Sequence, residues 1–364
     1  MRVLIAAGGT GGHIYPALAL ARYLHSREQA EILFVGTQKG MEKDIIPDSG
    51  FSLEMIPVVG LERRLSLQMG RAVFLAFSGL RAARQVIKRF RPDIVVGVGG
   101  YVSGPVVLAA ALAKIPTVIH EQNAIPGLTN VLLSRVASSV CLSIPGSERH
   151  FPRPGRTVLT GNPRASEAVA ADGKDTIPTG LLPGVPLLLC VGGSHGAARL
   201  NEAFTDSIAK VLSACDAQVV YVTGKRYFAE VSAKLAAAEV RFPKRLHIIP
   251  YHPALPELLT KTSLMVSRAG ATTLAEVTAL GVPAVLVPSP NVTNNHQEYN
   301  ARMLSDHGAA VLIKEEDLTS ALLTELLTEL LKNIHRLREM SDASRSLGFP
   351  DAAERMAAVL RELA

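Results

Sequence analysis

Glycine-rich loops follow three predicted strands, and each loop opens a predicted helix. They occupy residues 8–13 (Gly-Gly-Thr-Gly-Gly-His), 99–104 (Gly-Gly-Tyr-Val-Ser-Gly) and 192–196 (Gly-Gly-Ser-His-Gly). Backbone N–H groups at the start of a helix bind phosphate, and glycine lets a ligand approach them closely. One such loop alone is equally well explained by a tight turn. Three of them at the carboxyl ends of strands predict a ligand site, because open α/β sheets bind ligands there.

Two ionisable side chains near these loops could move a proton. His13 ends the first glycine loop, and an unperturbed imidazole titrates near pH ~6.5, which suits a general base. From residue type alone, the simpler explanation of His13 is a helix-start residue that bonds to backbone. Glu121 comes at a predicted strand end, before Gln122 and Asn123. Its carboxylate is the rival base, or a group that orients a substrate.

A fourth strand, glycine turn and helix follow one another just before Glu276. Thr273 and Glu276 have the spacing of a capping box, in which the carboxylate only caps its own helix. The alternative is that this helix N-terminus faces a diphosphate while Glu276 accepts hydrogen bonds from a ribose diol. We favour the ligand interpretation because residues 294–300 (Asn-Asn-His-Gln-Glu-Tyr-Asn) add amide groups after the next strand. Gln297 and Asn300 are three residues apart and share a helix face.

Other well-known site motifs are missing from the sequence. Neither G-x-G-x-x-G nor G-x-x-x-x-G-K-[ST] occurs, so dinucleotide binding and P-loop nucleotide hydrolysis lose their main support. The cysteines are Cys141, Cys190 and Cys215, without C-x-x-C spacing. Their number and spacing argue against a disulfide scaffold and against a zinc ribbon.

Length and composition predict two folded domains that position these loops. The chain has 364 residues, whereas a single core stops growing near ~250–300 residues. With 48% hydrophobic and 19% charged residues, it is not intrinsically disordered. Apolar strands alternate with helices in both halves, which predicts two doubly wound, Rossmann-like α/β domains with parallel sheets. The expected strands are 3–7, 31–35, 94–98, 117–120, 139–142, 187–191, 218–223, 246–250, 263–267, 284–287 and 310–313.

The expected domain bounds are 1–163 for an N-terminal domain, 164–340 for a C-terminal domain and 341–364 for a final amphipathic helix. A linker rich in Pro, Gly and Asp begins near residues 161–163. The packing partner of the last helix stays open, with the N-terminal domain as one candidate. Residues 94–113 carry no charge, but their glycines predict a strand, a loop and a helix instead of a membrane span. The first residues are too short an apolar run for a signal peptide, which predicts a cytoplasmic protein.

Positive charge is concentrated in the first half of the chain. The formal charge is +6, of which residues 1–163 contribute +8 and residues 164–364 contribute −2. Residues 63–91 hold eight basic side chains, no acidic one and several large apolar ones. A basic amphipathic stretch binds anionic membrane surfaces, although a core helix with a solvated basic face fits equally well. The residues expected to face lipid are Phe74, Leu75, Arg71 and Arg81. Nucleic acid ranks low, because aromatic content is 5% without tryptophan.

Taken in order along almost the whole chain, these motifs closely resemble the MurG family, the bacterial peptidoglycan N-acetylglucosaminyltransferases. The matching segments are 8–13, 99–105, 120–130 (His-Glu-Gln-Asn-Ala-Ile-Pro-Gly-Leu-Thr-Asn), 161–163 (Gly-Asn-Pro), 192–194, 267–271 (Ser-Arg-Ala-Gly-Ala) and 296–297. The resemblance implies the GT-B fold, with two doubly wound domains facing a cleft. It also implies transfer of N-acetylglucosamine from UDP-N-acetylglucosamine to undecaprenyl-diphospho-N-acetylmuramoyl-pentapeptide, converting lipid I to lipid II in peptidoglycan biosynthesis.

The resemblance further implies where the protein works and with what. It places the chain at the cytoplasmic face of the cell membrane as a peripheral protein. Its partners would be the UDP-sugar donor, the lipid-linked acceptor, an anionic membrane surface and other cell-wall and division proteins, linking it to cell shape and the cell cycle. The N-terminal domain would meet the acceptor and the membrane, and the C-terminal domain would bind the donor.

Carried over by position, the resemblance implies one set of substrate-binding residues. Thr10, Gly11 and Gly12 would lie at the donor sugar and diphosphate, Ser194 at the phosphates and Gln297 at the sugar hydroxyls. The full set is Thr10, Gly11, Gly12, Asn123, Asn130, Arg164, Ser194, His252, Ala271, Thr272, Thr273, Leu274, Ala275, Glu276 and Gln297. Two positions depart from the family pattern, since Arg164 stands one place early after Gly-Asn-Pro and His195 replaces a glutamine.

For such a transfer, the acceptor hydroxyl must lose its proton and the departing diphosphate must be stabilised. With the resemblance, His13 is the preferred base and Glu121 its rival. Asp-x-Asp, the metal-holding motif of many transferases of the other common fold, does not occur. We therefore expect neither metal nor cofactor, and leaving-group stabilisation by the 271–276 helix start, Ser194 and Arg164. Single displacement would invert the anomeric centre.

Two alternatives remain open from the sequence. One is another enzyme of similar fold, either a UDP-N-acetylglucosamine 2-epimerase or a transferase with a different lipid acceptor. The other is a catalytically idle UDP-sugar-binding or scaffold protein.

Overall fold

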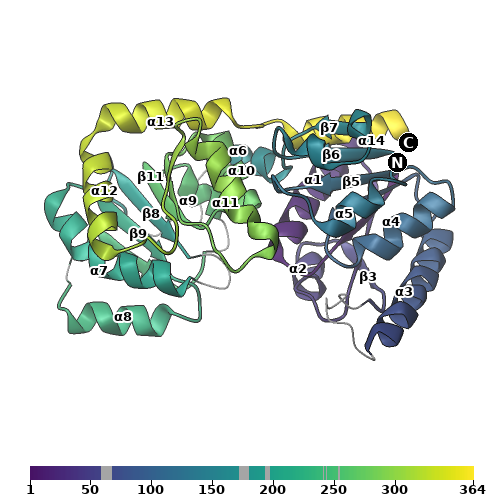
Figure 1. Cartoon of the computed structure of the whole chain (residues 1–364), viewed down its shortest axis with the longest axis horizontal. Helices are drawn as coiled ribbons and strands as arrows, with labels where there is room; N and C mark the ends of the chain where they lie inside the picture. The colour runs from purple at the N-terminus through teal and green to yellow at the C-terminus, as the bar shows by residue number, and fades with distance from the viewer. Residues whose placement is uncertain (59–67, 172–179, 193–196, 241, 243, 253–254) are drawn as a thin grey trace. The chain divides into compact units, whose positions relative to one another are not determined.

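The computed structural model of the chain describes residues 1–58, 68–171, 180–192, 197–240, 242, 244–252 and 255–364. The chain divides into two compact units. Unit 1 comprises Met1–Ser166 and Asp351–Ala364, and unit 2 comprises Glu167–Pro350. In each unit, helices pack around a sheet of parallel strands (Figure 1). The division places residues 164–166 in unit 1, and residues 341–350 in unit 2 with the preceding chain, which differs from the expected bounds at both points.

Unit 1 is built on a sheet whose strand order is β3-β2-β1-β4-β5-β6-β7. The strands are β1 (Arg2–Ala7), β2 (Glu31–Gly36), β3 (Ser52–Met55), β4 (Ile94–Gly99), β5 (Thr117–Glu121), β6 (Ser139–Leu142) and β7 (Thr157–Leu159). Neighbouring strands pair in parallel throughout this order. Strands β1 and β4 are fully apolar and buried, apart from Arg2 at the first position. Such continuous apolar runs are typical of parallel strands covered by helices on both faces.

The sequence patterns missed the two edge strands of this sheet. β3 (Ser-Leu-Glu-Met) is partly exposed along its length, and β7 is three residues long. An edge strand is buried on fewer sides, so its residues need not form the apolar run that identified the inner strands.

The helices of unit 1 are α1 (Gly11–Glu28), α2 (Glu42–Asp48), α3 (Gln68–Phe90), α4 (Ser103–Leu112), α5 (Leu128–Leu133) and α14 (Ala352–Leu363), and α6 (Arg164–Ala170) begins there. Short 3₁₀ turns lie at Ser147–His150 and Pro154–Arg156. The final helix α14 contacts α1, and its apolar face, including Met356 and Leu360, is part of the unit 1 core. The chain therefore closes on the unit in which it began.

Helix α3 carries much of the basic stretch. Between Leu80 and Phe90 its inner face is apolar, with Val86 and Ile87 buried, while Arg81 is exposed. The side chains of residues 68–77 lie outside the described part of the structure, and so do the expected lipid contacts of Phe74, Leu75 and Arg71. Within the described residues, no helix has both the length and the apolar character to span a bilayer.

Unit 2 repeats the architecture with strand order β10-β9-β8-β11-β12-β13, all parallel. The strands are β8 (Leu187–Val191), β9 (Gln218–Val222), β10 (Leu246–Ile249), β11 (Leu264–Ser267), β12 (Ala284–Leu286) and β13 (Ala310–Leu312). The helices are α7 (Ala198–Ala214), α8 (Phe228–Ala237), α9 (Leu255–Leu259), α10 (Ala271–Leu280), α11 (His296–Ser305), α12 (Ser320–Lys332) and α13 (Ile334–Ser346), with a 3₁₀ turn at Thr293–Asn295. In both units the strand order reverses beside the first strand, next to β1 and next to β8. Ligands bind at such switch points.

Candidate active site

The first two glycine loops meet at the switch point of unit 1, where β1 and β4 lie side by side. A Cβ atom at Gly100 would lie 2.3 Å from the Gly8 carbonyl oxygen, so the two backbones are in direct contact. A Cβ at Gly99 would lie 2.5 Å from Cδ2 of His13. Gly99 and Gly100 also have φ values of +114° and +79°. Positions 99 and 100 therefore require glycine for two reasons: there is no room for a side chain, and the backbone conformation is one that other residues rarely adopt.

His13 lies in the first turn of α1, whose N-cap is Thr10. Its Nδ1 is 3.2 Å from the Gly8 carbonyl oxygen and 3.3 Å from Thr10 Oγ1. The histidine thus makes the backbone contact that the simpler explanation predicts. The same contact fixes the orientation of the ring, which a base also requires, so the two interpretations are compatible. Gly11 and Gly12 are the first two residues of α1, where helix N–H groups point away from the helix.

A buried carboxylate that sequence analysis missed forms a hydrogen bond with the backbone of the first glycine loop. Glu42, at the start of α2, is fully buried. Its Oε2 accepts a hydrogen bond from Gly9 N at 2.9 Å, and its Oε1 accepts from Thr37 N at 2.9 Å and Thr37 Oγ1 at 2.7 Å. Burial by itself would raise the pKa of Glu42, but these hydrogen bonds together bring it below its ordinary value. The only hint in the sequence is that glycines at 36 and 40 come close before this residue.

A second buried cluster lies at the end of β5. His120 is fully buried, and its Nε2 is 3.2 Å from the Gly161 carbonyl oxygen and 2.9 Å from Ser143 Oγ. Burial lowers the pKa of His120 from 6.5 to about 4; the Gly161 hydrogen bond opposes this shift and the charge of His13 adds to it. Gln122 Nε2 donates to Val98 O at 2.6 Å, which ties this cluster to β4. His120 is therefore a neutral structural side chain.

Glu121 organises the loop that follows β5. Its Oε1 accepts hydrogen bonds from the backbone N and from Nδ2 of Asn123, at 3.0 and 3.2 Å. Its Oε2 accepts from Gly127 N at 3.0 Å and from Asn130 Nδ2 at 2.8 Å. The carboxylate is buried and accepts four hydrogen bonds from one loop. This geometry fits the orienting role considered from the sequence better than the role of base.

Arg164 belongs to unit 1 and lies beside α1, although the expected bounds assigned it to the second domain. Its guanidinium lies over the ring of Tyr15, 5.4 Å from the ring centroid, and Tyr15 is two residues after His13. Its backbone N donates to Asn162 Oδ1 at 3.0 Å. The arginine is thus close to the glycine loop that the resemblance links to the donor.

In unit 2, helix α10 begins directly after β11 and the glycine turn. Its N-cap is Gly270, so Thr273 lies inside the first turn, and the capping-box prediction for Thr273 and Glu276 is wrong. Glycine at the N-cap leaves no side chain over the helix N-terminus. Glu276 is buried, while the side chains of residues 271–273 and 275 are half-buried and Leu274 is part of the core. This helix end therefore offers backbone N–H groups to a ligand.

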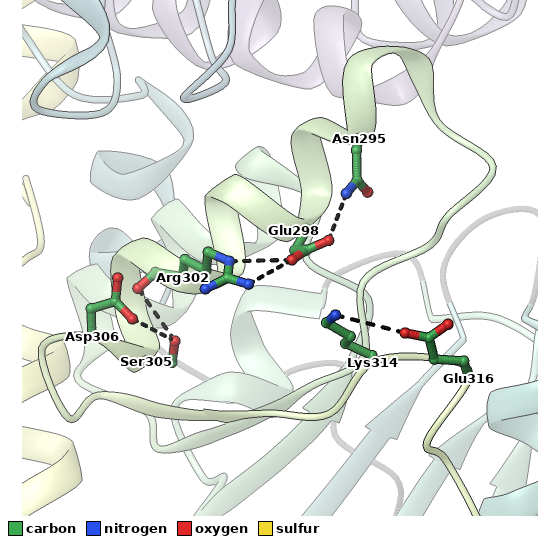
Figure 2. A network of polar contacts seen from close by, with 7 residues as sticks. All are labelled: Asn295, Glu298, Arg302, Ser305, Asp306, Lys314 and Glu316. Carbon is green, nitrogen blue, oxygen red and sulfur yellow. Dashed lines mark hydrogen bonds and ion pairs between the residues drawn. The ribbon is translucent and has the colours of Figure 1, made fainter.

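Helix α11 has two differently occupied faces. Gln297 Oε1 accepts a hydrogen bond from Ser289 N at 2.9 Å, and Asn300 Nδ2 donates to Ala269 O at 3.3 Å. Both residues therefore contact loops that follow strands, Gln297 the loop after β12 and Asn300 the loop after β11. Another face carries the network of Figure 2, in which Asn295 and Arg302 donate to Glu298. Hydrogen bonds from Arg302 and Asn295 lower the pKa of Glu298.

The carboxyl-edge loops of unit 2 are also tied to one another. Arg268 follows β11, forms an ion pair with Glu315 beyond β13, and donates to Val287 O at 3.0 Å. His252 is buried three residues after β10. Ser194 and His195 lie outside the described residues, so their expected contacts with phosphate stay predictions.

The described residues contain no group of three or more His, Cys, Asp or Glu side chains arranged to hold a metal ion. The described cysteines are buried thiols without a disulfide partner.

Both units match domains of one known protein family. Residues 3–142 match the model of the glycosyltransferase family 28 N-terminal domain, and residues 187–356 match that of the family 28 C-terminal domain. The chain belongs to glycosyltransferase family 28. The two family 28 domains correspond to the two sheets, with the C-terminal match running into α14.

Curated relatives in family 28 match the chain from end to end. A protein of Halalkalibacterium halodurans is 42% identical over 366 residues, covering 100% of both chains. A protein of Bacillus licheniformis is 44% identical over 365 residues, covering 100% of this chain and 99% of the relative. Both are named UDP-N-acetylglucosamine–N-acetylmuramyl-(pentapeptide) pyrophosphoryl-undecaprenol N-acetylglucosamine transferase.

Solved structures share the fold. MurG of Acinetobacter baumannii is 31% identical with a TM-score of 0.76 and covers 99% of each chain. A putative UDP-N-acetylglucosamine 2-epimerase from Listeria monocytogenes has a TM-score of 0.75 at 17% identity, covering 99% of this chain and 96% of its own, which shows the fold alone. The GT-B-type pair of doubly wound units expected from the sequence is confirmed.

Proposed function

We propose that this family 28 enzyme transfers N-acetylglucosamine from UDP-N-acetylglucosamine to undecaprenyl-diphospho-N-acetylmuramoyl-pentapeptide, forming lipid II from lipid I. The observation that carries the proposal is identity of 42–44% along the entire chain to relatives named for this transfer. Peptidoglycan biosynthesis, and through it cell shape and division, is the process that such a reaction serves.

Unit 2 binds the donor in this proposal. The N-terminus of α10 offers N–H groups to the diphosphate, and Glu276 and residues 271–275 line the ribose side. Gln297 fits the sugar hydroxyls, because its carbonyl oxygen is held by Ser289 N while its amide group remains a donor. His252 and Ser194 complete the set, at the uracil and the phosphates. Backbone N–H groups and an amide side chain can fix the orientation of a ligand although they carry no charge themselves.

Unit 1 supplies the proton chemistry and the acceptor side. His13 takes the proton of the attacking hydroxyl, and Thr10, Gly11 and Gly12 lie at the donor sugar and diphosphate. Glu121 orients Asn123 for the sugar and holds the buried Asn130 within the same loop. Arg164 adds positive charge for the leaving diphosphate. A single displacement follows, so the α-linked donor gives a β-linked product.

The transfer assay separates this function from its alternatives. Labelled UDP-N-acetylglucosamine is incubated with the enzyme and a short-chain analogue of the lipid-linked acceptor, and labelled disaccharide lipid is measured. We expect product only when the acceptor is present. Epimerised or hydrolysed donor without acceptor would instead favour a 2-epimerase-like enzyme, and tight UDP binding without any conversion would favour an idle scaffold.

The membrane proposal concerns location. A peripheral position at the cytoplasmic membrane face fits an acceptor carried on undecaprenyl diphosphate, and cell-wall and division proteins there would be further partners. The exposed Arg81 on α3 fits a positively charged surface. Each such charge near an anionic surface contributes on the order of 1 kcal/mol.

Vesicle binding tests the location. The protein should sediment with anionic vesicles at low salt and be released at high salt. Changing Phe74 and Leu75 to serine should weaken binding. Matched control changes are Leu322→Ser and Ile334→Ser, two exposed apolar residues of unit 2. Equal loss with both pairs, or no vesicle binding by the parent, would contradict the proposal.

A further inference from the structure

The peptide group between Gly8 and Gly9 is hydrogen-bonded at both of its ends. Its N–H, on Gly9, donates to Glu42 Oε2 at 2.9 Å. Its carbonyl oxygen, on Gly8, lies 3.2 Å from Nδ1 of His13. In a trans peptide these two groups point in opposite directions. The carboxylate of Glu42 and the imidazole of His13 are therefore connected through one peptide plane.

The surroundings prevent this peptide from turning. A Cβ at Gly100 would lie 2.3 Å from the Gly8 carbonyl oxygen, so the second glycine loop presses on that side. On the other side, a Cβ at Gly8 would lie 2.6 Å from Glu42 Oε1. Gly36 and Gly40 approach Glu42 as closely. A Cβ atom at Gly36 would lie 2.6 Å from Glu42 Cγ, and one at Gly40 would lie 1.8 Å from Glu42 Oε2. Three glycines thus leave room for one buried carboxylate aimed at the Gly9 N–H.

We propose that Glu42 is a positioning residue for the transfer reaction, acting on His13 through the Gly8–Gly9 peptide. The proposal rests on the proposed function, in which His13 is the base.

The first consequence concerns which nitrogen of His13 carries the proton. Two groups contact Nδ1, the Gly8 carbonyl oxygen at 3.2 Å and Thr10 Oγ1 at 3.3 Å. The hydroxyl can donate or accept, whereas the carbonyl oxygen only accepts, so the arrangement that satisfies both contacts has the proton on Nδ1. Nε2 is then the nitrogen with the lone pair. Because Glu42 holds the Gly9 N–H, it keeps the Gly8 carbonyl pointed at Nδ1 and so maintains this tautomer. A carboxylate performs the same task directly in serine-protease triads.

The second consequence concerns charge. In the reaction, the acceptor oxygen bonds to the anomeric carbon, the bond to the diphosphate breaks with its electron pair leaving on UDP, and the hydroxyl proton moves to Nε2. The imidazolium then donates its Nδ1–H to Gly8 O and later returns a proton to solvent. A peptide whose N–H donates to a carboxylate is polarised, which makes its carbonyl a stronger acceptor. Glu42 therefore stabilises the imidazolium.

Two other ionisable groups lie near this turn. Buried His120, from β5, is neutral near pH 7. Arg164, at the start of α6, lies over the ring of Tyr15, two residues after His13 on α1. Both stay unchanged in a Glu42 variant, so a change in pH dependence reports on Glu42.

Kinetics of Glu42→Gln test the relay. A glutamine has the same size, but it has only one acceptor oxygen, so it can accept either from Gly9 N or from Thr37, and not from both. We expect kcat to fall about 10- to 100-fold, by analogy with the loss of a hydrogen-bond partner behind a metal-ligating histidine, with the KM for UDP-N-acetylglucosamine unchanged. The acidic limb of the pH profile of kcat/KM should move to lower pH, because neutralising Glu42 makes the imidazolium less stable.

The matched control is Glu28→Gln. Glu28 ends α1, the helix that carries His13, and forms an ion pair with Arg361 of α14. Its loss should lower stability without moving the pH profile. In a His13→Asn background, Glu42→Gln should have no further effect on kcat. An additional loss there, or an unshifted profile with normal kcat, would overturn the relay.

Nitrogen NMR of the unmodified full-length protein provides a second test that needs no folded Glu42 variant. The His13 signal, assigned by its absence in His13→Asn, should be that of the Nδ1–H tautomer at neutral pH. An Nε2–H tautomer would overturn the proposal. Failure of the parent enzyme to transfer sugar would count against the proposed function instead, and normal transfer by His13→Asn would count against His13 as base.

Discussion

The two units share one architecture but hold the loops at their switch points by different means. In unit 1, buried carboxylates accept hydrogen bonds from the N–H groups of the loops: Glu42 binds Gly9 N, and Glu121 accepts from four donors of the loop after β5. In unit 2, the corresponding edge is organised by a glycine-capped helix end, by Gln297 on Ser289 and by the Arg268–Glu315 ion pair.

This difference follows the chemistry that each unit is proposed to perform. A base must present its nitrogen to the substrate hydroxyl at a defined angle. Buried hydrogen bonds to a charged group fix such an angle, because a buried donor or acceptor left without its partner costs free energy. A diphosphate is bound by backbone N–H groups and a helix dipole, which tolerate small displacements. We therefore expect substitutions in unit 1 to alter turnover and substitutions in unit 2 to alter donor affinity.

His13→Ala should have the largest effect. Removing a general base lowers turnover by about 10²- to 10⁴-fold, while the KM for UDP-N-acetylglucosamine should stay near its parent value. Steady-state kinetics with the lipid-linked acceptor measure both constants. Near-normal turnover would exclude His13 as base, and a loss confined to KM would place it on the donor instead.

Glu121→Gln should come next. The glutamine amide would face N–H donors, and each buried donor left without an acceptor costs about 1–3 kcal/mol. We expect turnover to fall about 10- to 100-fold, together with a lower free energy of unfolding. Glu148→Gln, an exposed residue of unit 1, is the matched control and should change neither quantity. Parent-like turnover of Glu121→Gln would mean that the loop does not depend on its carboxylate.

His120 should make unit 1 sensitive to acid while leaving unit 2 unaffected. Its pKa is about 4 in the folded protein and 6.5 in the unfolded chain. The unfolded state therefore binds a proton more readily between these values. The stability that neutral His120 provides is fully present above pH 6.5 and falls by about 1.4 kcal/mol per pH unit as the pH drops towards 4.

Hydrogen exchange of the β5 amides, followed against pH, measures this loss within unit 1. In His120→Gln the corresponding slope should be smaller, while the β8 amides of unit 2 respond alike in both proteins. Equal slopes for β5 in the two proteins would contradict burial of a neutral imidazole.

Gln297→Ala should have the smallest effect. Loss of a hydrogen bond to a sugar hydroxyl costs about 1 kcal/mol, or roughly fivefold in the KM for UDP-N-acetylglucosamine. Inhibition by UDP, which lacks the sugar, should not change. Glu298→Gln, on the face shown in Figure 2, is the control and should leave both constants alone. Equal weakening of UDP and of the donor by Gln297→Ala would move this residue from the sugar to the nucleotide.

Sequence patterns predicted the inner strands of both sheets because buried parallel strands are apolar at nearly every position. They missed β3, which is partly exposed, and β7, which is three residues long, although the edge strands β10 and β13 of unit 2 were predicted. The capping box considered as the alternative for Thr273 and Glu276 is contradicted, because the N-cap of α10 is Gly270. The glycine loops could be proposed as a ligand site because three of them follow strands, whereas His13 was preferred as the base only through the family resemblance. Glu42 was not, because its importance comes from a contact with Gly9, 33 residues away, that no local pattern encodes.

The anomeric configuration of the product tests the central claim, a single displacement of UDP by the acceptor hydroxyl, most directly, because each displacement inverts the anomeric carbon. A single turnover with UDP-N-acetylglucosamine and an acceptor analogue is followed by NMR of the new glycosidic linkage. Direct attack by a hydroxyl deprotonated at His13 predicts a β-linkage alone. An α-linked product would contradict it, because a single displacement inverts the anomeric carbon of the α-linked donor.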